Sequence, residues 1–147
     1  MQNRLSLLPA LALMIFSAGS GKTAESFRGP VEATVVRIQD GDTFLADAHV
    51  WPGHTVRVNI RIRGIDAPEK RARCAWERER AAAAREALAA LIPPASTVIV
   101  SSIGGAKYYG RVLADVSTAE GEPIAETLLK TGLVVSYSGG RRISRCG

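Results

Sequence analysis

The clearest pattern in the chain is a strict alternation of apolar and polar residues between positions 56 and 63. Apolar side chains stand at even positions and polar ones at odd positions, in the order Val56, Arg57, Val58, Asn59, Ile60, Arg61, Ile62 and Arg63. Successive side chains of a β-strand point to opposite faces, so this pattern predicts a strand with one face in a core. The opposite face carries three arginines and an asparagine.

A β-hairpin is predicted upstream of this strand. Residues 31–39 are rich in β-branched and apolar side chains and indicate a first strand. Asp40-Gly41 is a strong hairpin turn signal, and a return strand is expected to begin at Thr43. We expect a loop at residues 49–53, where Trp51-Pro52-Gly53 interrupts the pattern.

The period changes after Pro68, where a helix is predicted. Residues 76–91 consist mainly of Ala, Glu, Arg and Leu, which are good helix formers. Apolar residues recur at helical spacing and predict one buried stripe: Ala81, Ala84, Leu88, Leu91 and Ile92. Pro93-Pro94 then ends the helix, because proline lacks the N–H that a helix interior needs.

Shorter elements are expected in the last third of the chain. Strands are predicted at residues 97–101 and 111–116, with Gly104-Gly105 as the turn between them. Residues 123–130 indicate a short helix, since proline starts the segment and glycine follows it. A last extended segment is expected at residues 133–137.

This order of elements predicts a β-rich α+β fold. Roughly five strands, a main helix between the third and fourth and a short second helix after the fifth match a five-stranded OB-fold barrel. Barrels of this kind commonly bind nucleic acid on one face, but the fold alone does not establish a function.

The first 24 residues are predicted to be a signal peptide rather than part of the fold. A single arginine precedes an apolar run at residues 5–18, which is too short for a comfortable membrane span. Cleavage is expected near Gly19-Ser20 or after Ala24, although Lys22 is unusual there and leaves an uncleaved anchor open. Because the sequence has no other apolar run of that kind, we expect export to the periplasm or the medium, with no membrane span once the signal is removed.

The remainder of the chain is expected to form one domain. The 147 residues, 46% of them hydrophobic, are enough to bury a core. We place the domain at residues 31–137 and a short tail at residues 138–147, and we expect a monomer. The net charge of +5 favours a polyanionic partner, either nucleic acid or an anionic membrane or wall, and does not choose between them.

Two cysteines, Cys74 and Cys146, bear on the tail. In an exported protein an even number of cysteines favours a disulfide, which would tie the tail to the start of the first helix. The alternative is a pair of free thiols. A zinc site is not expected, because no matching pair of histidines accompanies the cysteines.

Three polar motifs carry the candidate chemistry. They are Asp40-Gly41-Asp42-Thr43, then Arg61-Ile62-Arg63-Gly64-Ile65-Asp66-Ala67-Pro68-Glu69, and then Tyr109-Gly110-Arg111. Together they supply oxygen ligands for a hard divalent cation, a further carboxylate and two guanidinium groups. Phosphodiester cleavage builds negative charge on the phosphoryl oxygens, which a cation and two guanidinium groups would offset.

The order and spacing of these motifs resemble the thermonuclease family, the staphylococcal-nuclease-like domains. The segments that match are the three above, with Val112-Leu113-Ala114 continuing the last of them, and a weaker Thr131-Gly132-Leu133-Val134. The resemblance covers roughly residues 31–137. It implies an OB-fold enzyme, a phosphodiesterase or endonuclease that hydrolyses DNA, RNA or both, and an open barrel face of this kind favours single strands.

The resemblance also implies a metal site. Asp42 and Asp66 would bind Ca²⁺ through their carboxylates, with the backbone carbonyl of Ala67 as a further ligand. Asp40 would act on the ion through a water molecule. Calcium suits this set because it is a hard ion that takes oxygen ligands.

Three further residues would carry out the reaction. Glu69 would deprotonate or position the attacking water, and the sequence does not decide between these roles. Arg61 and Arg111 would grip the phosphoryl oxygens, because a guanidinium group can bind them bidentately.

The expected nucleic-acid contacts depart from the family pattern. Members place a lysine and a tyrosine just before the Gly-Arg pair, whereas here Tyr108 and Tyr109 stand there and Lys107 comes one residue earlier. Tyr109 can donate to a phosphate or stack on a base, and Tyr137 is the candidate for the nucleoside pocket. Long members also continue into a third helix that this sequence lacks, and a Cys74–Cys146 bridge would fasten the short tail in its place.

Two other interpretations stay open. The first is a non-catalytic nuclease-like module that binds only nucleic acid or a protein, although the complete set of motif residues favours the enzyme. The second is a wall- or membrane-associated structural protein, supported by the charge and by Lys22. Each motif taken singly also has an ordinary interpretation, as a hairpin turn, a helix start or a solvated strand face.

Overall fold

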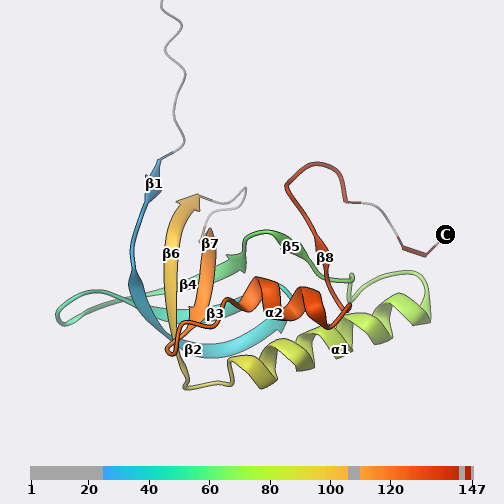
Figure 1. Ribbon diagram of the computed structural model, residues 1–147, viewed down its shortest axis with the longest axis horizontal. Helices are drawn as coiled ribbons and strands as arrows, with labels where there is room; N and C mark the ends of the chain where they lie inside the picture. The colour runs from blue at the N-terminus through green and yellow to red at the C-terminus, as the bar shows by residue number, and fades with distance from the viewer. Residues whose placement is uncertain (1–24, 106–109, 143–144, 147) are drawn as a thin grey trace, which may run out of the picture.

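The computed structural model describes residues 25–105, 110–142 and 145–146, and its centre is a closed mixed β-barrel. The five barrel strands are β2 (Val31–Asp40), β3 (Thr43–Trp51), β4 (His54–Ile62), β6 (Thr97–Gly105) and β7 (Arg111–Thr118). Neighbouring strands are antiparallel except for β4 and β7, whose parallel pairing closes the barrel. The short β1 (Ser26–Phe27) pairs with Ile103 and Gly104 of β6, beyond the stretch of β6 that pairs with β2 (Figure 1). The predicted barrel is confirmed.

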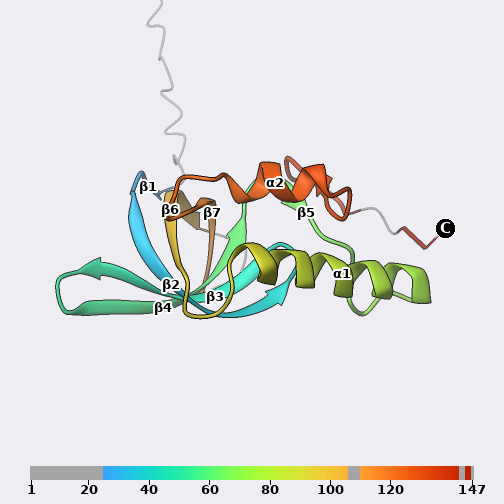
Figure 2. The same cartoon turned by 60° about the horizontal axis from the view of Figure 1, so that its bottom comes forward.

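Two helices pack on this barrel. The main helix α1 (Ala75–Leu91) contacts β2, and the short α2 (Ile124–Lys130) contacts both α1 and β7. A second small sheet pairs β5 (Ile65–Asp66) with β8 (Val135–Ser136) beside the helices (Figures 1 and 2). Both predicted helices are therefore present, and no helix in the described part of the chain is long and apolar enough to cross a membrane.

The core lies between the barrel and α1. Ala81, Ala84, Leu88 and Ile92 of the predicted stripe are buried, whereas Leu91 is only partly buried. The other buried apolar side chains come from all five barrel strands and α2, among them Val35, Phe44, Ile60, Ile62, Val98, Val100, Ala114, Ile124 and Leu128. Burying one such leucine or isoleucine contributes about 1.5–3 kcal/mol, so this shared interior fixes α1 against the barrel.

The hairpin of β3 and β4 is longer than predicted. Strand β3 continues to Trp51 and leaves only Pro52-Gly53 as the turn, so the predicted loop at residues 49–53 is wrong. The tip of this hairpin reaches beyond the barrel (Figures 1 and 2). Val56 therefore lies exposed although it belongs to the alternating pattern, because no second layer covers the tip.

The predicted turn at Gly104-Gly105 is also wrong. Both glycines belong to β6, which pairs with β7 as far as Gly105. The strand is interrupted instead by a bulge between Ser101 and Gly104, where Ser102 has a φ of 50°. The glycines thus mark an irregular strand rather than its end.

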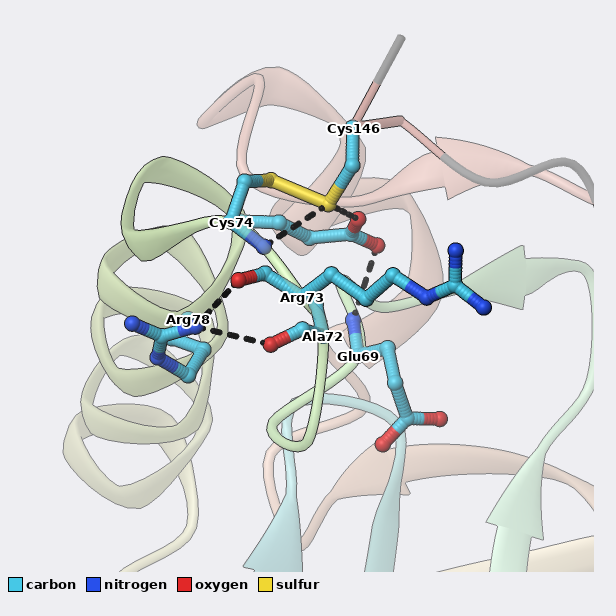
Figure 3. The surroundings of a disulfide bond; sticks show 7 residues. Glu69, Ala72, Arg73, Cys74, Arg78 and Cys146 are labelled. Carbon is cyan, nitrogen blue, oxygen red and sulfur yellow. Dashed lines mark hydrogen bonds between the residues drawn. A yellow bond between two sulfur atoms is a disulfide. The ribbon is translucent and has the colours of Figure 1, made fainter.

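The C-terminal tail is joined to the start of α1 by a disulfide between Cys74 and Cys146. Figure 3 shows this bond next to the segment that carries Glu69. The carboxylate of Glu77, only 5% exposed, accepts a 3.2 Å hydrogen bond from the Glu69 N–H, and its other oxygen lies 3.2 Å from Cys146 Sγ. Of the two sequence-based alternatives for the cysteines, the bridge is therefore confirmed.

Candidate active site

Three chain segments bring the candidate residues together at one end of the barrel. The β2–β3 turn carries Asp42, whose backbone carbonyl accepts a 2.9 Å hydrogen bond from the Ile62 N–H. In the same ladder Thr43 pairs with Arg61. Asp66 follows in β5, where it pairs with Val135 of β8. Backbone pairing therefore places two carboxylates and an arginine side by side.

Gly41 allows this turn to sit close to α1. A Cβ atom at this position would lie 2.6 Å from Cβ of Ala84 and 3.0 Å from Cβ of Ala67. Contacts that short do not occur between real side chains, so only glycine fits without a shift of the helix. The glycine of the Asp-Gly-Asp motif thus holds the turn against the helix, in addition to making the turn.

Asp42 and Asp66 are buried carboxylates bridged by Arg61. They are 2% and 5% exposed. Arg61 Nη1 lies 2.8 Å from Asp42 Oδ1, and Arg61 Nη2 lies 2.9 Å from Asp66 Oδ1. Asp42 also accepts 2.8 Å hydrogen bonds from the Thr43 hydroxyl and the Ala67 N–H. A buried charge is costly unless it is paired and hydrogen-bonded, and both carboxylates meet that condition.

A polar pocket of about 160 Å³ opens beside these carboxylates. Its lining includes all the predicted catalytic and metal-binding residues except Asp66: Asp40, Asp42, Arg61, Ala67, Glu69 and Arg111. Asp66 is joined to the same cluster through Arg61. Asp40 forms its own ion pair with Lys70 at 2.7 Å. The structure thus gathers the predicted set in one place and adds Lys70 to it.

Arg142 of the C-terminal tail also lines this pocket. This residue was not among those predicted from the sequence. Its Nη2 lies 2.6 Å from Asp66 Oδ1 and its Nη1 lies 2.9 Å from Glu69 Oε2. Partial burial lowers the pKa of Arg142, but the hydrogen bond to Asp66 and the nearby carboxylate charges outweigh it and raise that pKa above its ordinary value. The signal in the sequence was Cys146, since a bridge to Cys74 would bring the tail to this end of the barrel.

Other predicted contacts lie partly outside this cluster. Lys107, Tyr108 and Tyr109 fall outside the described residues. Tyr137 packs under Arg61, whose guanidinium carbon lies 5.8 Å from the ring centroid. A hollow of about 510 Å³ is bordered by both of these residues and lies next to the polar pocket.

A second hollow also adjoins the polar pocket. It has a volume of about 570 Å³ and shares Lys70 with the polar pocket. Arg37 and Arg85 line it as well, with Glu86 as its acidic residue. This excess of positive charge next to a polar cleft favours an extended polyanion.

The donor set at the pocket fits a hard divalent cation. Three carboxylates, from Asp42, Asp66 and Glu69, surround the guanidinium of Arg142, so the cluster already accommodates a positive charge. Oxygen donors of this kind suit calcium or magnesium. Cys74, Glu77 and Cys146 also lie within 4.8 Å of one another, but both sulfurs belong to the disulfide and are not available as thiolate ligands.

Comparison with known proteins agrees with this geometry. A search of curated proteins found no match to the chain. The family model described as staphylococcal nuclease homologue matches residues 59–144, more than half of the sequence. The matched range contains Arg61, Asp66, Glu69 and Arg111, and it extends through Arg142. The chain therefore belongs to the staphylococcal nuclease family.

Proposed function

We propose that this protein is an exported, calcium-dependent nuclease that hydrolyses phosphodiester bonds of DNA, RNA or both. The observation that carries the proposal is the polar pocket, in which the buried carboxylate of Asp42 meets Arg61, Glu69 and Arg111, while the buried Asp66 is joined to it through Arg61. A purely structural ion pair would not need a further carboxylate and a further arginine around an open pocket. Membership of a nuclease family supports the same conclusion.

The two arginines are proposed to bind the scissile phosphate. Arg61 is held from two sides by Asp42 and Asp66, which fixes the orientation of its guanidinium plane. Arg111 enters the pocket from the start of β7, the neighbour of β4 in the barrel. Guanidinium groups from two adjacent strands can contact different phosphoryl oxygens and offset the charge that builds up on them.

The cation would be held by the carboxylates of Asp42 and Asp66. Ala67 would add its carbonyl oxygen and Asp40 would contribute through water. When bound, such an ion would polarise a phosphoryl oxygen and offset the negative charge that builds up on the phosphoryl oxygens. The buried position of both carboxylates supports this assignment, since water competes little for them.

Glu69 is proposed to accept a proton from the attacking water or to position that water. Its side chain is 44% exposed and borders the pocket, so it remains accessible to solvent. The hydrogen bond from its backbone N–H to the buried Glu77 holds the Glu69 segment in place. An anchored backbone with a solvent-facing carboxylate is a suitable arrangement for a general base.

A single strand is the proposed substrate. The polar pocket shares Arg61 with the hollow beside Tyr137 and Lys70 with the basic hollow. The first has an aromatic ring and room for a base, and the second carries positive charge for the backbone. A stiff duplex would not follow such a path as easily as one flexible strand.

Export is proposed from the first 24 residues and the disulfide. Disulfides persist in oxidising compartments outside the cytosol. The Cys74–Cys146 bond is thus consistent with the signal peptide that the sequence indicates.

The proposal is tested by incubating the purified protein with single-stranded DNA, duplex DNA and RNA, in added Ca²⁺ or in excess chelator. We expect cleavage in Ca²⁺, little in chelator, and a loss of about 10²-fold or more in Arg111→Ala. Arg57→Ala is the matched control, because Arg57 pairs with Asp47 on the exposed hairpin. Equal cleavage by Arg111→Ala and Arg57→Ala would reject the assigned site.

One observation favours a second candidate function, a non-catalytic nucleic-acid- or protein-binding module. Arg142 already neutralises the carboxylates of Asp66 and Glu69. In a module without catalysis, this network would simply hold the tail in place. Binding of single-stranded DNA without cleavage at any Ca²⁺ concentration would support the module and reject the nuclease.

A further inference from the structure

Arg142 contacts the carboxylates that are proposed to hold the cation. It makes its closest contacts with Asp66, through Nη2 at 2.6 Å and Nε at 3.0 Å to Oδ1, and Nε lies 3.1 Å from Oδ2. The same Nη2 is 3.7 Å from Asp42 Oδ2. Asp42 and Asp66 are the two carboxylates assigned to the cation under the proposed function.

Arg142 and a divalent cation cannot both bind Asp66 at the same time. Asp66 Oδ1 accepts hydrogen bonds from both Arg61 and Arg142, so its lone pairs are already used. A cation bound to this oxygen would also lie within a few ångströms of the guanidinium, where two positive charges repel each other. Arg142 must therefore leave Asp66 before an ion can bind there.

The disulfide keeps Arg142 close to the site. Cys146 follows Arg142 by four positions and is bonded to Cys74, which precedes α1 and comes eight positions after Asp66. Figure 3 shows the bond beside Glu69, the third carboxylate that Arg142 contacts. A short tether of this kind maintains a high effective concentration of the attached group, so Arg142 rebinds readily after each release. Arg145 adds a second, weaker contact at 3.6 Å from Asp66 Oδ2.

We propose that Arg142 is a tethered competitor for the cation site and that it sets the affinity of that site for a divalent cation. The inference rests on the proposed function, because it assumes that Asp42 and Asp66 bind the ion. The apparent dissociation constant is inversely proportional to the fraction of time that Arg142 is away from the site, so a site that Arg142 occupies about nine-tenths of the time binds the cation about tenfold more weakly. The tail thus makes the enzyme respond to a higher calcium concentration than the carboxylates alone would require.

The test is the calcium affinity of the full chain, measured by isothermal titration calorimetry. Arg142→Gln should lower Kd for Ca²⁺ by about tenfold, because it removes the competitor. Arg141→Gln is the matched control, since it removes the same charge from an exposed neighbouring position. It should change Kd by less than about twofold, because a solvated charge acts weakly at a distance.

The role of the tether is tested in a Cys74→Ser, Cys146→Ser background. Serine is well accepted at position 74, because this residue is the N-cap of α1. In this background Arg142→Gln should change Kd by less than about twofold, since an untethered tail competes poorly. If Arg142→Gln still lowers Kd about tenfold without the bridge, the disulfide is not what keeps Arg142 at the site.

A measurement on the unaltered protein gives an independent readout. The Nε–H resonance of Arg142 should shift as Ca²⁺ is titrated, because its hydrogen bonds to Asp66 are lost. Suppose that calcium binds, that the Arg142 resonance does not move, and that Arg142→Gln has the same Kd as Arg141→Gln. The role of Arg142 as a competitor is then overturned, while the calcium site stands. If no variant binds Ca²⁺, the proposed calcium site fails and the competitor fails with it.

Discussion

Replacing Arg61 with methionine removes the positively charged guanidinium group between the two buried aspartates, Asp42 and Asp66. Arg61 is 17% exposed and lies 2.8 Å from Asp42 and 2.9 Å from Asp66. Methionine retains an unbranched apolar chain but makes neither contact. Asp42 then keeps its hydrogen bonds from Thr43 and Ala67, and Arg142 lies farther away, at 3.7 Å. The variant thus removes the guanidinium that lies 2.8 Å from this buried carboxylate.

The expected loss of stability follows from this geometry. Removing one partner of a buried ion pair costs about 3–5 kcal/mol. The remaining hydrogen bonds to Asp42, together with Arg142 on Asp66, place this variant at the lower end, about 3 kcal/mol. A loss of that size corresponds to a fall in Tm of roughly 10 °C for a domain of this length.

Urea denaturation followed by circular dichroism, in chelator so that no ion binds the carboxylates, would measure the effect. Adding Asp42→Asn to Arg61→Met should restore at least half of the lost stability, because the unpaired charge is then removed. Arg57→Met serves as a surface control and should lower the midpoint only slightly, since its ion pair with Asp47 is exposed. An Arg61→Met midpoint equal to that of Arg57→Met would refute the reasoning.

Three further predictions concern the basic hollow, the turn at Gly41 and the exposed hairpin. Arg85→Glu should raise KM for a long single strand but not for a dinucleotide, with kcat unchanged, because Arg85 lines the basic hollow and not the polar pocket. Steady-state kinetics that show equal KM changes for the two substrates would contradict this. Gly41→Ala should lower stability by about 1–3 kcal/mol in thermal denaturation, since its Cβ would lie 2.6 Å from that of Ala84, and an unchanged Tm would show that the helix yields freely. Asp47 should titrate by NMR with a pKa below its ordinary value, because the hydrogen bond from Arg57 favours the charged carboxylate. The stabilising effect of this ion pair is present above the ordinary pKa and is lost as pH falls through the lowered pKa. Arg57→Met should raise the pKa of Asp47 back toward its ordinary value.

Much of the barrel could be predicted because its signals are local. The alternation at residues 56–63 and the Asp40-Gly41 turn each specify a strand or a hairpin within a few positions. The helix at Ala75–Leu91 likewise follows from composition and spacing. The errors arose where a neighbour elsewhere in the chain decides the outcome. The hairpin extends past residue 49 because β3 and β4 pair beyond the barrel, and Gly104-Gly105 stays in β6 because β7 continues beside it.

The site residues also fall into those that local motifs predict and those that distant contacts bring in. Asp42, Asp66 and Glu69 belong to short motifs whose spacing resembles a known family, so their grouping could be predicted. Arg142 was missed, because it contacts Asp66 across 76 positions and no periodicity reports such a pairing; the bridge of Cys146 to Cys74 pointed to the tail but not to this residue. Glu77 was missed for a related reason, since a charged residue near a helix start is expected to face solvent, whereas the tail and the Glu69 backbone cover it.

The most direct test of the account is the rate at which Glu69→Gln cleaves single-stranded DNA in saturating Ca²⁺, compared with the unaltered protein. Glutamine keeps the shape of the side chain and its contact with Arg142 but cannot take a proton from water. The account predicts cleavage by the unaltered protein and a rate lower by about 10²-fold or more in the variant, with both proteins equally folded. Equal rates, or no cleavage by either protein, would contradict it.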